Sequence, residues 1–221
     1  MKSKQKFCNL KSDMLINLLR ILLIVGLLLN LSGYGLAEDL QRHVYREAKT
    51  GILLPSNLGH LRYQGVVEYK DYNNPELGVS IRYAMLDKSP ARADIFLYDL
   101  GLKNLGTGIL KPVVGLHFDA LNDDVFDMEK TGRYMSVTRT SMSSTALIIP
   151  SGKLPALTAQ FRFKQPAGPD VIYEGFQLSE LILTTYKDSF LKIRFSYPEE
   201  EKDKYKKVFT QFLSDLGKCL K

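Results

Sequence analysis

The sequence predicts an α+β fold in which an antiparallel sheet of about six to seven strands carries two main helices. Three observations predict it. Short segments alternate apolar and polar residues, most of these segments are joined by short turns, and two longer segments repeat apolar residues at helical spacing. Of the 221 residues, 45% are hydrophobic and 24% are charged, which is typical of a globular protein.

The first 37 residues have the three parts of a secretory signal peptide. Four lysines lie within the first 11 residues, an apolar run covers residues 21–29, and the small residues Gly35 and Ala37 precede Glu38. We therefore expect cleavage and export to the periplasm or the cell exterior. An uncleaved membrane anchor is the alternative, but the strongly apolar run has nine residues, whereas a spanning helix needs about 20. No stable membrane span is expected after cleavage.

Most of the positive charge belongs to this leader. The whole chain has 30 basic and 24 acidic residues, a net charge of +6, and residues 1–37 contain five of the basic ones and one of the acidic ones. The remaining chain has 25 basic and 23 acidic residues, hence a net charge of +2. A nearly neutral domain gives no electrostatic reason to expect a nucleic-acid partner.

Residues 38–60 are expected to form an N-terminal helix or arm followed by a connector. Within residues 39–49 three apolar residues recur at every fourth position, namely Leu40, Val44 and Ala48. Gly51 would end such a helix. A single α+β domain would then span residues 61–221.

The domain is expected to follow the order β-β-β-α-β-β-β-β-α. Strand-like segments lie at residues 61–69, 77–85, 93–100, 133–140, 146–149, 157–164, 171–176, 180–186 and 190–197, with a polar break at 141–144. The strand at 93–100 is apolar on both faces, which predicts a central position in the sheet. The strand at 190–197 carries an apolar side and an opposite side with Phe190, Lys192, Arg194 and Ser196.

Two amphipathic helices complete the fold. The first is expected from Pro112 to Gly132, because proline is well placed at a helix start and glycine at its end. Its apolar stripe comprises Val114, Phe118, Leu121, Val125 and Met128. The second is expected over residues 199–219, with an acidic first turn. Its apolar stripe comprises Tyr205, Val208, Phe209, Phe212, Leu213 and Leu216.

No catalytic, cofactor-binding or metal-binding residue is predicted. The three histidines do not stand at a ligand spacing. The acidic segment 119–127 lacks the glycine and glutamate of a calcium loop, so an exposed helix face is favoured. The glycine-rich segment 101–108 lacks the Gly-Lys-Ser/Thr ending of a phosphate-binding loop and is interpreted as a connector.

Two weaker candidates for a binding surface remain. Four tyrosines of the first strands would line a groove for an apolar or sugar-like ligand: Tyr63, Tyr69, Tyr83 and Tyr98. The favoured alternative is that their rings are buried and their hydroxyl groups are exposed to solvent. Cys219 is the one cysteine after the leader, so it would form an intermolecular disulfide or remain a half-buried small side chain.

The segment Gly-Val-Ser-Ile-Arg-Tyr at 78–83 and the terminal unit of residues 181–186, 190–197 and helix 199–219 carry a family resemblance. With them the chain resembles uncharacterised secreted bacterial proteins and, more remotely, the PsbP-like α-β-α sandwich. The resemblance implies a closing hairpin that feeds a helix lying back on the sheet. It also implies mostly non-enzymatic roles as accessory subunits, adaptors and envelope proteins, and it transfers no functional residue.

The sequence therefore favours a non-catalytic exported protein that binds an unknown envelope protein or a small ligand. A secreted or periplasmic hydrolase-like enzyme is the main rival, with its residues in the loops 101–111 and 141–153. A structural subunit linked through Cys219 is the third hypothesis.

Overall fold

The computed structural model describes residues 43–86, 89–167 and 173–221, and His43–Lys221 form one compact unit. The expected signal peptide lies outside the described residues. The regular elements are β1 (His43–Arg46), β2 (Leu53–Pro55), β3 (Asn57–Leu58), β4 (Leu61–Glu68), β5 (Val79–Ala84), β6 (Arg92–Tyr98), α2 (Pro112–Lys130), β7 (Met135–Ile149), β8 (Gly152–Lys164), β9 (Gln177–Tyr186), β10 (Ser189–Pro198) and α3 (Lys202–Cys219). Single 3₁₀ turns lie at η1 (Tyr69–Tyr72), η2 (Pro75–Leu77) and η3 (Glu199–Glu201).

The main sheet has eight strands in the order β3-β4-β5-β6-β10-β9-β8-β7, and each neighbouring pair is antiparallel. A separate two-stranded sheet pairs β1 with β2. The α+β class, the antiparallel sheet and the two main helices are thus confirmed. The expected count of six to seven strands is too low. The central position predicted for the strand at 93–100 is confirmed, because β6 lies between β5 and β10.

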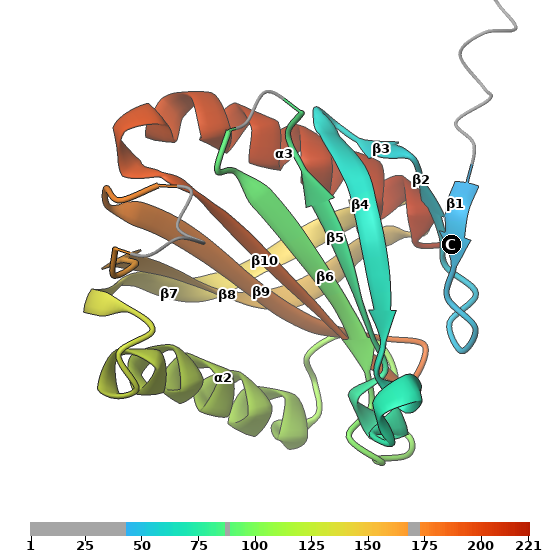
Figure 1. Ribbon diagram of the computed structural model, residues 1–221. Coiled ribbons are helices and arrows are strands. Elements are labelled where there is room, and N and C mark those ends of the chain that lie inside the picture. The colour runs from blue at the N-terminus through green and yellow to red at the C-terminus, as the bar shows by residue number, and fades with distance from the viewer. Residues whose placement is uncertain (1–42, 87–88, 168–172) are drawn as a thin grey trace, which may run out of the picture. The chain divides into compact units, whose positions relative to one another are not determined.

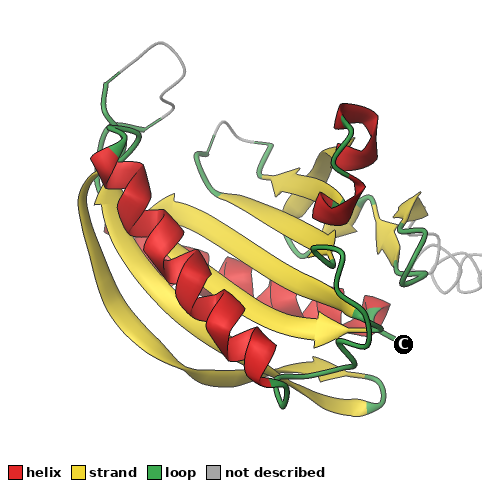
Figure 2. Ribbon diagram, turned by 90° about the horizontal axis from the view of Figure 1, so that it is seen from below, coloured by secondary structure: helices red, strands yellow, loops and turns green. Residues whose placement is uncertain are grey.

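The two helices lie on opposite faces of the sheet (Figures 1 and 2). The helix α3 packs against β3 near one end of the strand order and against β7 at the other, so the sheet curls around it. The helix α2 packs on the other face, against β7, β8 and β9. That face is therefore covered over one half, while β5, β6 and β10 lie mostly beyond the helix.

Alternation along the strands divides the core in two. Leu191, Ile193 and Phe195 of β10 belong to the cluster under α3, whereas Phe190 belongs to the cluster under α2. The helices contribute most of the stripes predicted for them: α3 buries Tyr205, Val208, Phe212 and Leu216, and α2 buries Val114, Phe118, Leu121 and Val125. Of the other predicted members, Phe209 and Leu213 are partly buried, and Met128 belongs to neither core cluster. Because each such side chain stabilises by about 1.5–3 kcal/mol when buried, both helices dock without a disulfide.

Three local predictions are wrong. The helix expected at 39–49 is excluded by β1, which pairs with Leu53–Pro55, so long-range pairing decides over the local spacing (residues 39–42 lie outside the described part). The break expected at 141–144 lies inside the continuous strand β7, which pairs with β8 along its length. Residues 173–176 form no strand, and 171–172 lie outside the described residues.

Candidate functional site

The half of the sheet that α2 leaves uncovered carries four basic residues. The residues before and after each of them point into the core under α3, so the four basic side chains lie on the opposite face of the sheet, the one on which α2 packs. They are Arg82, Arg92, Lys192 and Arg194. We call them the cationic face. The strand register aligns two of them in one row, because Asp94 of β6 stands opposite both Arg82 and Arg194. The next row places Phe96 opposite Lys192.

Lys192 carries a half-buried ammonium group. Within the described residues it makes no hydrogen bond and no ion pair, and its Nζ lies 4.0 Å from the ring centre of Phe96 and 5.6 Å from that of Tyr98. Burial, and then the charge of Arg194, lowers the pKa of Lys192 from its ordinary 10.5 to about 8. A desolvated cation without a counter-ion is costly to the fold, which is a mark of a functional position.

Arg194 is the second incompletely satisfied cation. Its Nε donates a hydrogen bond to Ser179 Oγ at 3.1 Å. Its Nη2 is buried and has no hydrogen-bond partner among the described residues. The guanidinium carbon lies 5.5 Å from the ring centre of Tyr134 and 5.9 Å from that of Phe163. A buried donor of this kind lowers stability unless something accepts from it.

The nearby acids do not neutralise these two cations. Asp94 is buried and accepts a hydrogen bond from Arg82 Nε at 2.7 Å, and Arg92 Nε lies 3.7 Å from its other oxygen. Asp124 on α2 raises the pKa of Lys192 through its charge but forms no ion pair with it. The cationic face therefore keeps an excess of positive charge beside unpaired donors.

His117 closes the site from α2 as a neutral group. Its Nε2 and the hydroxyl of Tyr98 share a hydrogen bond of 2.7 Å, and its ring lies 4.5 Å from that of Phe190. Burial, and then the charge of Lys192, lowers the pKa of His117. Burial raises the pKa of Tyr98, so both groups are uncharged at neutral pH. They add a hydrogen-bonding rim with no charge of its own.

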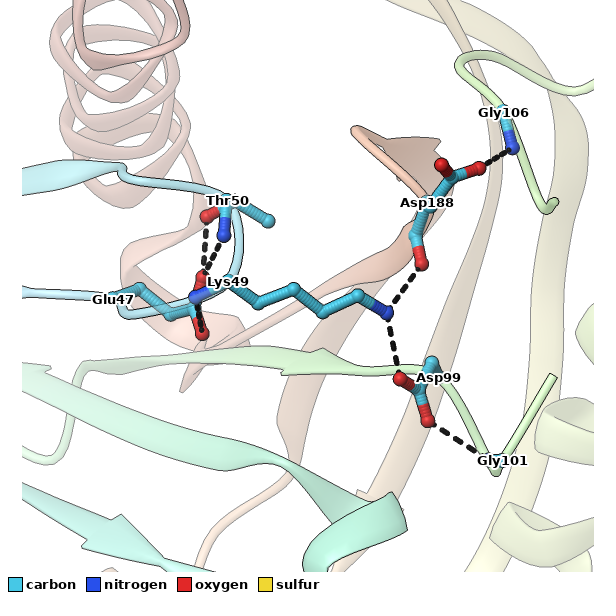
Figure 3. A network of polar contacts seen from close by, with 7 residues as sticks. All are labelled: Glu47, Lys49, Thr50, Asp99, Gly101, Gly106 and Asp188. Carbon is cyan, nitrogen blue, oxygen red and sulfur yellow. Dashed lines mark hydrogen bonds and ion pairs between the residues drawn. The ribbon is translucent and has the colours of Figure 1, made fainter. Parts of the chain in front are cut away.

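A cleft of about 220 Å³ is the second candidate. It lies between the β1–β2 hairpin and strands β5 and β6, and its charged lining residues are Arg46, Glu47, Lys49, Glu68, Lys70 and Asp99. Figure 3 shows how Lys49 reaches across from the hairpin turn. Its Nζ donates hydrogen bonds to Asp99 Oδ2 at 2.6 Å and to the backbone oxygen of Asp188 at 2.8 Å.

Most of the charged side chains that line this cleft are already paired with other groups of the protein. Glu47 accepts from the N–H and hydroxyl of Thr50 at 2.6 and 2.5 Å, and Lys70 pairs with Glu68. Burial acts to raise the pKa of Asp99, but the hydrogen bonds from Lys49 and from the Gly101 N–H outweigh it and lower the pKa. We therefore interpret these contacts as a clamp that holds the hairpin, and not as a binding site.

The four tyrosines do not form one surface. Tyr83 is fully buried and donates its hydroxyl to the Pro55 carbonyl at 2.7 Å, with the ring of Tyr63 at 5.9 Å on the same face. Tyr98 lies on the opposite face, beside Lys192, and Tyr69 begins the turn η1. Of the four, Tyr98 alone contributes to the cationic face. A single groove lined by all four does not fit this placement.

Cys219 is half-buried at the end of α3, with its Sγ donating to the Asp215 carbonyl at 3.4 Å. Burial, and then the charge of Asp215, raises the pKa of the thiol to about 11. Disulfide formation proceeds through the thiolate, so this environment opposes it. The intermolecular disulfide stays a prediction.

The remaining sequence candidates occupy structural positions. The segment 101–108 is held by backbone pairing of Gly108 with Thr185 and by a hydrogen bond from the Gly106 N–H to Asp188 Oδ1 at 2.6 Å (Figure 3). Asp123 and Asp127 are exposed, and Asp127 pairs with Lys130. In the part of the chain that the structure describes, no three His, Cys, Asp or Glu side chains come together as metal ligands would.

Sequence reasoning missed the pair formed by Lys192 and Arg194. Both stood on the polar side of a predicted strand, which alone indicates a solvated face. The available signal was the position of two cations at i and i+2 on a strand whose hairpin leads directly into a docking helix. Their lack of partners depends on Asp94 being engaged by Arg82, and that contact depends on strand register.

No family model matches the chain, and no curated protein matches it at a significant level. Within the described residues, no helix combines the length and the apolarity needed to cross a membrane.

Proposed function

We propose that this chain is an exported, non-catalytic protein of the cell envelope that binds an amphiphilic anion at its cationic face. The order of basic, apolar and small residues in positions 1–37 supports export. The unpaired donors of Lys192 and Arg194 support an anionic ligand, and they are the observation that carries the proposal. The helices on opposite faces of the sheet support the resemblance to PsbP-like α-β-α domains. That resemblance would fit a non-catalytic, accessory role.

The chemistry of the site favours a carboxylate, phosphate or sulfonate attached to an apolar body. Residues at i and i+2 of a strand lie about 7 Å apart, so one anionic group can accept from both Lys192 and Arg194. The rings of Phe96, Tyr98 and Tyr134 lie against these two cations and offer apolar contact to the rest of the ligand.

The test uses 8-anilinonaphthalene-1-sulfonate, an aromatic anion whose fluorescence rises on binding. The purified protein is titrated with this probe, next to Lys192→Met, Arg194→Met and the control Lys206→Met. Lys206 is exposed on α3, a helix of the other face. We expect each site variant to weaken binding about tenfold or more, because a hydrogen bond to a charged group is worth about 1.5–3 kcal/mol.

The control should bind the probe as the parent does. Circular dichroism of each variant verifies that the fold is kept. Equal affinity in the parent and both site variants would refute the cationic face as the binding site.

A further inference from the structure

The two edges of the main sheet differ sharply. One edge is blunt, because β3 has two residues. Bulges do not distinguish the edges, since β4 has one register shift and β7 has two, between Met135 and Thr138 and between Arg139 and Ser141. The other edge is β7, which has 15 residues, of which 11 are exposed. Its one charged residue is Arg139, and it contains no proline. Long edge strands without charges or prolines are what soluble proteins normally avoid, because their unpaired N–H and C=O groups bind other strands.

The open part of this edge has clear limits. At its start, Glu129 Oε1 accepts a hydrogen bond from the backbone N–H of Val137 at 3.2 Å. Near its end, the backbone oxygen of Ile148 lies directly against Gly217 of α3. Between these contacts the eight residues 138–145 are all exposed, and we call them the open edge. Its length is about 27 Å at the rise of a β-strand.

A groove of about 350 Å³ runs beside the open edge. It is lined by Gly115, Phe118, Asp119, Met142, Ser143, Ser144 and Leu157. Gly115 lies inside α2, where glycine costs about 1 kcal/mol relative to alanine. A Cβ atom at this position would meet nothing within 4 Å, so no packing contact of the chain accounts for the glycine. Its missing side chain keeps the groove open.

The charge of the groove indicates what can occupy it. Asp119 is its one charged lining residue and has no hydrogen bond or ion pair within the described chain. Arg139 does not reach it, because its Nη1 donates to Asn122 Oδ1 at 3.4 Å. An antiparallel pair of two β7 strands has its two-fold axis perpendicular to the sheet, which would bring both α2 helices, and both copies of Asp119, to the same face. Like charges there disfavour a second copy of this chain.

We propose that the open edge receives an extended strand of a partner protein by β-augmentation. An apolar side chain of that strand enters the groove beside Met142, and a lysine or arginine two residues away, on the same face of the strand, pairs with Asp119. Backbone pairing would supply affinity and the groove would supply selectivity, which is the usual division in strand addition. This site lies on the other flank of α2 from the cationic face and is independent of the proposed anion.

The test uses fluorescein-labelled octapeptides and fluorescence anisotropy. The basic probe has a central leucine and lysines two residues before and after it, so that these side chains share one face of the extended peptide, with threonine at the other positions. The acidic probe has glutamate in place of each lysine, and a third probe is the basic peptide with its backbone N-methylated at alternate residues. The purified protein should bind the basic probe about tenfold or more tightly than the acidic one. The N-methylated probe should not bind, because it cannot donate to the strand edge.

Two variants and one control make the test specific. Gly115→Leu fills the groove and should weaken binding of the basic probe about tenfold while the melting temperature does not fall, because leucine favours the helix. Asp119→Asn should remove most of the preference for the basic probe. Asp123→Asn, an exposed position on the same helix, is the control and should keep it.

Any of four results would overturn the proposal. Three come from the peptide titrations: equal binding of the basic and acidic probes, unchanged binding by Gly115→Leu, or binding of the N-methylated probe. Sedimentation showing a dimer that Ser143→Lys dissociates would assign the open edge to a second copy instead.

Discussion

Replacing Lys192 with methionine is expected to stabilise the protein at neutral pH. The ammonium group of Lys192 is held half-buried between Phe96, Tyr98 and Arg194, without a hydrogen bond or counter-ion in the described chain. Methionine has a similar volume and no charge to desolvate. A binding residue that lowers the stability of the free protein is what a trade-off between stability and function predicts.

The magnitude follows from the pKa. Lowering the pKa of Lys192 from 10.5 to about 8 corresponds to a loss of about 3 kcal/mol of folding free energy while the side chain is charged. The substitution also removes the cation–π contact with Phe96, which is worth about 1 kcal/mol. The variant should therefore gain about 2 kcal/mol at pH 7.

The stability difference between Lys192→Met and the parent depends on pH. Below pH 8 Lys192 is charged in the folded and unfolded states, so its cost is fully present. Between about 8 and 10.5 the folded state loses the proton first, and above 10.5 both states are neutral. The free energy of unfolding, measured in urea, should thus differ between variant and parent by about 2 kcal/mol at pH 7 and by close to zero at pH 10.5. A variant that is less stable at pH 7, or a difference that does not change with pH, would refute the reasoning.

Three further outcomes are expected. Gly217→Ala should lower the free energy of unfolding by about 3 kcal/mol or more, because its Cβ would lie 2.0 Å from the backbone oxygen of Ile148; urea titration measures this. Lys49→Met should cost about 1 kcal/mol at most and speed hydrogen exchange in the β1–β2 hairpin, because its contact with Asp99 is partly exposed. The thiol of Cys219 should react with iodoacetamide at pH 8 about a hundredfold more slowly than free cysteine, because its pKa is about 11, and Cys219→Ser should give the same monomer band on a non-reducing gel.

The parts of the fold that the sequence predicted are those whose apolar residues are numerous and repeat at the period of their element. The apolar stripes of α2 and α3 carry the helical period because each helix presents a single face to the core, whereas the hairpin of β9 and β10 is rich in apolar residues because it is buried on both faces. The open edge shows neither feature, because residues 138–145 are exposed on both faces and need no apolar positions. Its serine-rich sequence therefore resembles a loop, although β8 pairs with it on both sides of one register shift between Arg139 and Ser141.

The helix prediction for the N-terminal segment was wrong for the opposite reason, because a local pattern was present but did not decide the structure. Spacing of four between apolar residues predicted a helix, but the backbone of His43–Arg46 pairs with Leu53–Pro55, and these partners lie outside the segment whose spacing was considered. The cationic face is a similar case. Lys192 and Arg194 are visible in the sequence, whereas the pairing of Asp94 with Arg82, which leaves them without a counter-ion, exists only once β5, β6 and β10 are in register.

The helix α2 separates two candidate surfaces of opposite charge, because the cations Lys192 and Arg194 of β10 lie beyond one flank and Asp119 lines the groove on the other. Asp124 lies on the flank near Lys192, while Asp119 lines the groove on the flank near β7. Between them the helix is anchored by buried apolar side chains, so neither surface shares a side chain with the other. Free energies of sites without shared partners are additive, so Lys192→Met should leave octapeptide binding unchanged and Asp119→Asn should leave binding of the anionic probe unchanged. A protein of this design would bind an anion on one flank of α2 and a basic strand on the other, and each site would act without the other.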